Sequence, residues 1–135
     1  MQQVQAIIDC DVHNTYRSQV ELYPFLQEPW LSRLKEKGFG YSLDTFHSSV
    51  QAKRLDAKPE NGPAGSDYGL LKTQLLDKLS IDYGILTGEG ISGVSYMPDA
   101  EYPAALASAY NHWMVEEWLS KDERLLGSLH LAIQN

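Results

Sequence analysis

Residues 4–14 read VQAIIDCDVHN, and this stretch decides the fold. Its apolar run at residues 6–8, followed at once by polar residues, predicts a buried strand over residues 4–12 that becomes polar at its carboxyl end. Such strands are typical of α/β proteins at the place where their sites lie. The alternative interpretation is that Asp9 and Asp11 only begin a turn.

Leucines and aromatic residues that recur at helical spacing predict two helices. The first begins at Ser66 or Asp67, either of which can cap it, and runs to about Ser80. Its stripe consists of Leu71, Leu75, Leu76 and Leu79. The second helix, which Asp99 can cap, runs to about Ser120. We expect its stripe to belong to the core rather than to a cofactor site: Ala107, Tyr110, Met114 and Trp118.

Two further strands, over residues 83–87 and 124–135, complete the alternation. Strands that alternate with helices predict βαβ units and a parallel sheet with right-handed crossovers. The last strand would take its apolar content from Leu125, Leu129, Leu131 and Ile133. Because a parallel sheet needs cover on both faces, we expect this sheet to be part of a larger one.

Residues 38–66 are predicted to form an irregular excursion, because they lack periodicity and are rich in proline and glycine towards their end. A short helix over residues 31–37, closed by Gly38, precedes them. Long irregular segments in compact domains are often lids or binding loops, although some are plain linkers.

Composition narrows the class of protein. The 135 residues carry 11 Lys and Arg against 18 Asp and Glu, a net charge of −7, and 43% are hydrophobic, which indicates one globular domain or a piece of a larger one. The acidic balance argues against binding to nucleic acid or to an anionic membrane surface.

No apolar run is long enough to span a bilayer. The start of the chain does not resemble a signal peptide. With Cys10 as its single cysteine, the chain is expected to be cytoplasmic.

The strongest candidate for chemistry is the triplet Asp11-Val12-His13. Residues two apart on a strand point to the same side, so the carboxylate and the imidazole would project together. Aspartate oxygen and histidine nitrogen are both good ligands for zinc and similar divalent ions. By itself the spacing is common, and a turn capped by Asp11 is the favoured interpretation of the triplet alone.

Three segments together resemble one family. Residues 7–13, IIDCDVH, residues 110–119, YNHWMVEEWL, and residues 122–133, DERLLGSLHLAI, occur in the order seen in the amidohydrolase-related branch of the metal-dependent amidohydrolase superfamily. This branch includes enzymes similar to aminocarboxymuconate-semialdehyde decarboxylase. The resemblance covers most of the chain and is loosest between residues 38 and 66.

The resemblance implies the N-terminal part, about three βα units, of a (β/α)8 TIM barrel with parallel strands. Members hydrolyse, or decarboxylate, small carboxylate-bearing substrates with one divalent metal ion, commonly zinc, and without an organic cofactor. Asp11 and His13 would be the first two metal ligands. Asn14, Tyr16 and Arg17 would line the barrel mouth and bind the substrate, with Arg17 pairing with its carboxylate. A solvent-facing Arg17 is the simpler alternative.

The sequence departs from the family pattern in two ways. Asp11 stands where a histidine is commonest, and the other ligands and the catalytic acid or base belong to strands five, six and eight, so they are expected beyond Asn135. Catalytic zinc usually has three protein ligands. His47, His112 and His130 are expected to be structural or solvent-facing. The loop at residues 88–90 should lie on the same rim as the metal motif. We therefore expect the 135-residue chain alone to have no turnover.

A second hypothesis belongs to a different class. The chain could be a truncated, non-catalytic remnant that self-associates, or that needs a partner to cover its open sheet edge. A complete small domain of flavodoxin type is a third possibility, which the three-strand count and the lack of a phosphate-binding loop disfavour.

Overall fold

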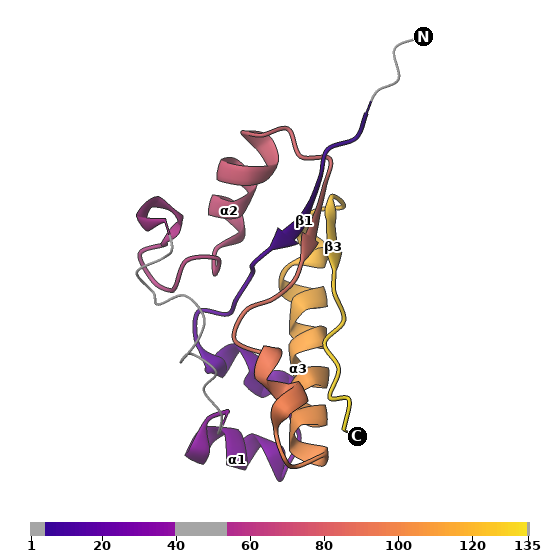
Figure 1. Cartoon of the computed structure of the whole chain (residues 1–135). Helices are drawn as coiled ribbons and strands as arrows, with labels where there is room; N and C mark the ends of the chain where they lie inside the picture. The colour runs from indigo at the N-terminus through magenta and orange to yellow at the C-terminus, as the bar shows by residue number, and fades with distance from the viewer. Residues whose placement is uncertain (1–4, 40–53, 135) are drawn as a thin grey trace.

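The computed structural model describes residues 5–39 and 54–134 and shows an α/β fold with a parallel sheet (Figure 1). The strands are β1 (Ile8–Val12), β2 (Tyr83–Leu86) and β3 (Leu125–Gly127), in the sheet order β1-β2-β3. The helices are α1 (Trp30–Lys37), α2 (Tyr68–Leu71) and α3 (Glu101–Glu117). A π-helical segment, η4 (Lys72–Asp77), continues α2, and short 3-10 helices are Gln19–Phe25, Leu55–Ala57, Ser92–Tyr96 and Leu119–Lys121.

Both strand pairs are parallel, as the alternation of strands and helices predicted. Gly84 of β2 lies beside Asp9 of β1 and Leu125 of β3, so all three strands pair at this level of the sheet. The carboxyl ends of the three strands therefore meet at one edge. β1 begins at Ile8, later than the expected residue 4, and residues 1–4 lie outside the described part of the chain.

The third strand is much shorter than expected over residues 124–135. The last ladder contact is the N–H of Ser128, which donates to the carbonyl of Leu86, where β2 also ends. Beyond that point the chain has no strand beside it and runs along other elements instead. Gln134 Nε2 donates to the carbonyls of Val94 and Met97. The prediction of a strand to residue 135 was wrong because a strand needs a neighbour as well as apolar residues.

The first long helix begins as predicted, but its interior differs. The Asp67 carboxylate accepts a hydrogen bond from the N–H of Leu70 and caps α2. The π-helical segment that follows is wider than an α-helix and shifts the side chains around the axis. As a result Leu76 is fully buried, whereas Leu79, expected in the same stripe, is 54% exposed.

Among the described residues, helix α3 supplies more of the buried hydrophobic core than any other element. The Asp99 carboxylate accepts hydrogen bonds from the N–H groups of Glu101 and Tyr102, so it performs the predicted capping role. The predicted stripe is buried, and Leu106, Tyr102 and Trp113 widen it. The aromatic rings of Tyr110, Trp113 and Trp118 pack against one another. No helix of the described residues is long and apolar enough to cross a membrane.

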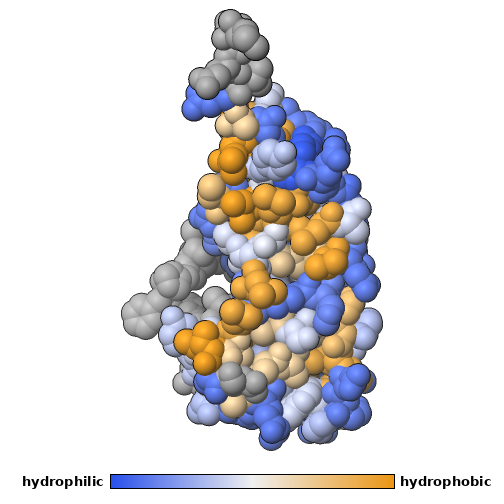
Figure 2. All heavy atoms as spheres, turned by 90° about the vertical axis from the view of Figure 1, so that its right-hand side faces the viewer, coloured by the Kyte–Doolittle hydropathy of each residue, from blue (hydrophilic) through white to orange (hydrophobic). Residues whose placement is uncertain are grey.

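The two faces of the sheet differ. On one face, a Cβ at Gly84 would lie 3.4 Å from Leu76 and a Cβ at Gly127 would lie 2.8 Å from Met114, so η4 and α3 both pack there. On the other face Ile8, Tyr83 and Leu126 are each about half exposed: 52%, 44% and 49%. Figure 2 shows hydrophobic residues at the surface on the side of the molecule that carries β3 and the C-terminal segment. Exposed there are Leu129, Leu131 and Ile133.

The short helix predicted over residues 31–37 is α1, and Gly38 ends it in the left-handed region at φ 61°. Within the expected irregular segment 38–66, residues 40–53 lie outside the described residues. Residues 54–66 contain only one short 3-10 helix between turns.

Candidate metal and substrate site

The carboxyl end of β1 carries a β-bulge. The register with β2 shifts between Asp9 and Val12, so β1 holds one more residue than the strand beside it. The N–H of Asp11 donates to Asp9 Oδ1 at 3.1 Å, while the carbonyl of Val12 accepts from the N–H of Thr87 at 2.9 Å. The bulge takes the backbone N–H of Asp11 out of the regular ladder. The Asp9 carboxylate accepts the hydrogen bond that this N–H would otherwise lack.

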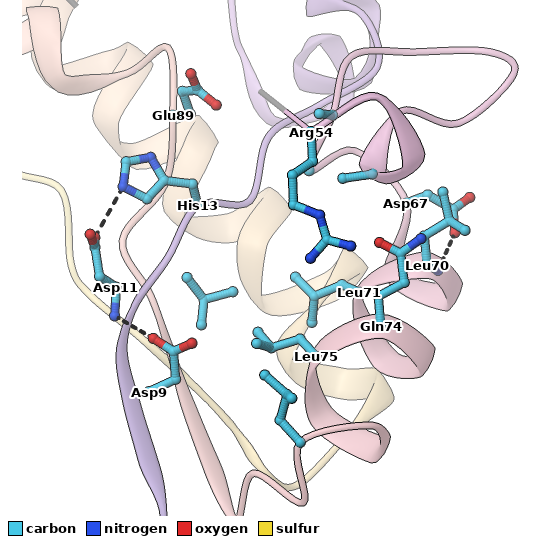
Figure 3. Close-up of a pocket in the computed structure, with 15 residues that line it drawn as sticks. Asp9, Asp11, His13, Arg54, Asp67, Leu70, Leu71, Gln74, Leu75 and Glu89 are labelled. Atoms are coloured by element: carbon cyan, nitrogen blue, oxygen red, sulfur yellow. Dashed lines mark hydrogen bonds and ion pairs between the residues drawn. The ribbon is translucent and has the colours of Figure 1, made fainter. Parts of the chain in front are cut away.

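Asp11 and His13 lie side by side, as their spacing on a strand predicted. His13 Nε2 is 3.0 Å from Asp11 Oδ1, and the two side chains are 76% exposed for Asp11 and 56% for His13 (Figure 3). The hydroxyl of Thr87, which directly follows β2, donates to the same Asp11 oxygen at 3.2 Å. Two neighbouring strands thus bring three polar side chains together at the carboxyl edge of the sheet.

A pocket of about 450 Å³ opens beside this pair. Asp9, Asp11 and His13 lie along β1 on one side of it, and leucines from α2 and η4, including Leu71 and Leu75, form the opposite wall (Figure 3). The pocket therefore combines a polar wall of carboxylates and imidazole with an apolar wall, a combination typical of small-molecule sites.

Arg54 and Glu89 complete the rim. The guanidinium of Arg54 points into the pocket (Figure 3) and holds Asp56 with two hydrogen bonds. It is the one cationic residue among the described residues of the lining. Glu89 lies above His13 in the same view and belongs to the loop that leaves β2, as expected for the rim. Gly88 and Gly90 flank it with positive φ angles of 75° and 80°.

The structure does not bring Asn14, Tyr16 and Arg17 into this pocket. Asn14 is fully buried. The Tyr16 ring packs against Tyr110 and two other aromatic rings. Arg17 pairs with Asp67 at 2.8 Å, on the other side of the N-terminus of α2. Their substrate-binding roles stay predictions.

The remaining histidines lie elsewhere. His47 falls outside the described residues, and His112 is exposed on α3. His130 was expected within a strand but lies beyond the end of β3, where the Asn111 side chain holds its backbone with two hydrogen bonds. Its ring is half-buried against Tyr110, and this burial lowers the pKa of His130 below its usual 6.5.

Sequence reasoning missed Thr87 and Arg54, whereas it placed the loop that contains Glu89 on this rim. Thr87 could have been found, because it follows the second strand at the edge where the first strand places Asp11. Nothing in the sequence alone places Arg54, since its position depends on the course of an irregular segment.

Asp11 and His13 offer one oxygen and one nitrogen donor, which suit zinc or a similar ion. No group of three or more histidine, cysteine or acidic side chains that could hold a metal occurs within residues 5–39 and 54–134. The pair fits the ion in chemistry, and it supplies two of the three protein ligands that a catalytic zinc usually takes.

No protein-family model matches the chain, and no curated protein matches its sequence.

Proposed function

We propose that this chain forms three βα units of a (β/α)8 barrel of the amidohydrolase-related kind, in which Asp11 and His13 are the first two ligands of a divalent metal ion. One observation carries the proposal: the two side chains meet at 3.0 Å at the carboxyl edge of a parallel sheet, on the wall of a pocket. Sites of barrel enzymes lie at this edge. The half-exposed second face of the sheet supports the same fold, because it would face the barrel interior.

The reaction proposed is hydrolysis or decarboxylation of a small carboxylate-bearing substrate, without an organic cofactor. When bound, the ion supplies a Lewis acid that polarises the substrate and acidifies water. Arg54 is placed to attract a carboxylate, since its guanidinium points into the pocket. In a barrel of this kind the remaining ligands and the catalytic acid or base would come from strands five, six and eight.

Isothermal titration with Zn²⁺ tests the ligand assignment. The wild-type chain should bind one ion, and His13→Ala or Asp11→Ala should weaken that binding at least tenfold. His112→Ala is the matched control, because it removes an exposed histidine on α3 and should leave the affinity unchanged. Equal affinity in wild type and His13→Ala would rule out the proposed site.

A second candidate function is self-association through the C-terminal edge. The observation that favours it is the segment from Leu125 to Ile133, which carries no charged residue in a chain of net charge −7 and exposes several aliphatic side chains. Two copies can pair there with little charge repulsion, so the occupant proposed is a second copy of the chain. Light scattering should then show a dimer that Leu131→Lys disrupts and Val20→Lys, on the distant Gln19–Phe25 helix, does not. A monomer at all concentrations would refute it.

A further inference from the structure

Asp11 is held at its carboxylate and at its backbone N–H, and both contacts depend on local structure that a D-x-H spacing does not require. The first contact is with Thr87, whose hydroxyl lies 3.2 Å from Asp11 Oδ1 and 3.4 Å from the carbonyl of Val12. A hydroxyl has one proton to donate, and the carboxylate is the nearer and the charged acceptor.

The second contact acts on the backbone. Because of the bulge, the N–H of Asp11 turns towards Asp9 and donates to its carboxylate. Bulges near sites commonly change the direction of a side chain. Asp9 therefore stabilises the peptide orientation from which the Asp11 side chain leaves the strand. The carboxylate of Asp9 has a structural use here, although its spacing to Asp11 and His13 suggests a third ligand.

We propose that Thr87 and Asp9 are positioning residues, which fix the direction of the Asp11 carboxylate for the bound ion. This inference rests on the proposed function of Asp11 and His13 as ligands. His13 Nε2 now contacts Asp11 Oδ1. A histidine that ligates through Nε2 must give up that contact, because an ionised carboxylate only accepts and a metal-bound Nε2 has no proton to donate. Thr87 is then the side chain that still holds the carboxylate oxygen.

The geometry at Thr87 offers a matched pair of substitutions. Thr87→Val keeps the β-branched shape at the end of β2 and removes only the hydroxyl, while Thr87→Ser keeps the hydroxyl and removes a methyl group. At Asp9, Asn keeps an oxygen that can accept from the N–H of Asp11, and Ala does not.

Zinc titration of these variants tests the inference, with thermal unfolding as a check that each one folds. Thr87→Val and Asp9→Ala should bind Zn²⁺ about tenfold to a hundredfold more weakly, the usual effect of losing a partner of a metal ligand. Thr87→Ser and Asp9→Asn should bind within about threefold of wild type. If Thr87→Val does not fold, the Asp9 pair decides the question in the same way.

The outcomes separate the two proposals. If His13→Ala loses zinc while Thr87→Val and Asp9→Ala bind like wild type, the ligand assignment stands and the positioning role is wrong. If His13→Ala binds like wild type, both proposals fail together. If Thr87→Ser is as weak as Thr87→Val, the methyl contact matters rather than the hydroxyl, and Thr87 has no positioning role.

Discussion

At the scale of single residues, His130 gives the fold a pH-dependent stability. Its ring packs edge-on against Tyr110, with ring centroids 5.0 Å apart, and its Nε2 is buried without a hydrogen-bond partner among the described residues. A Cβ at Gly88 would lie 2.6 Å from this nitrogen, so the backbone of the loop after β2 closes over it. Burial lowers the pKa of His130, because the charged imidazolium would lose its hydration there.

The sign of the effect follows from proton linkage. A histidine with a lowered pKa in the folded state takes up its proton first in the unfolded chain. The stability that depends on neutral His130 is therefore complete above its ordinary pKa near 6.5 and is lost as the pH falls towards the folded value. The free energy of unfolding, measured in urea between pH 7.5 and 5, should fall with pH more steeply in wild type than in His130→Gln. Parallel curves for the two proteins would contradict this account.

The metal motif shows what residue patterns can and cannot predict. The pairing of Asp11 with His13 was predicted from their spacing on a regular strand, and the two side chains do meet. The strand is not regular at that point, however, and the bulge depends on the register with β2, which no local pattern contains. The role of Thr87 was not predicted either. Its contact with Asp11 joins residues that are 76 positions apart, so no local pattern contains it.

At the scale of elements, one side chain, Asp67, stabilises the N-terminus of α2 through contacts with two partners. Asp67 accepts from the N–H of Leu70 and also pairs with Arg17. Loss of a helix cap typically costs about 1 kcal/mol, whereas a surface ion pair contributes between about 0 and 1 kcal/mol. These contacts lower the pKa of Asp67, the cap contact most of all, so the contribution is present above pH 4 and is lost as the pH falls below its ordinary pKa.

Two substitutions separate the cap from the ion pair. Asp67→Ala should lower the free energy of unfolding by about 1 to 2 kcal/mol in urea, since it removes both contacts. Arg17→Ala removes only the ion pair and should have less than half that effect. Equal losses in the two variants would show that the ion pair, not the cap, stabilises this end of the helix.

Helix signals were the most reliable part of the sequence. Asp67, Asp99 and Gly38 mark helix ends through contacts between near neighbours in the chain, and all three act there as predicted. The widened turn of η4 and the early end of β3 were not predicted. Both depend on what lies beside the element: the packing of Leu76 against the sheet in one case, and the end of β2 in the other.

At the scale of the whole molecule, the parallel sheet places two polar groups at opposite edges. Asp11, His13 and Thr87 lie at the carboxyl edge. Asp77 and Asp122 precede β2 and β3, at the amino edge, where Arg124 binds both carboxylates. The order of elements predicted the parallel sheet, in which all strands share the same carboxyl and amino ends. Closure of the sheet into a barrel stays a proposal, since three strands fit many α/β architectures.

The location of a bound ion tests the central claim most directly. We would add Mn²⁺ to ¹⁵N-labelled protein and follow the paramagnetic broadening of each backbone amide. The account predicts that the amides of residues 11–14 and 87–89 broaden first, and that His13→Ala abolishes this selectivity. Broadening centred on Asp77 and Asp122, or spread evenly over the acidic surface, would contradict a metal site at the carboxyl edge of the sheet.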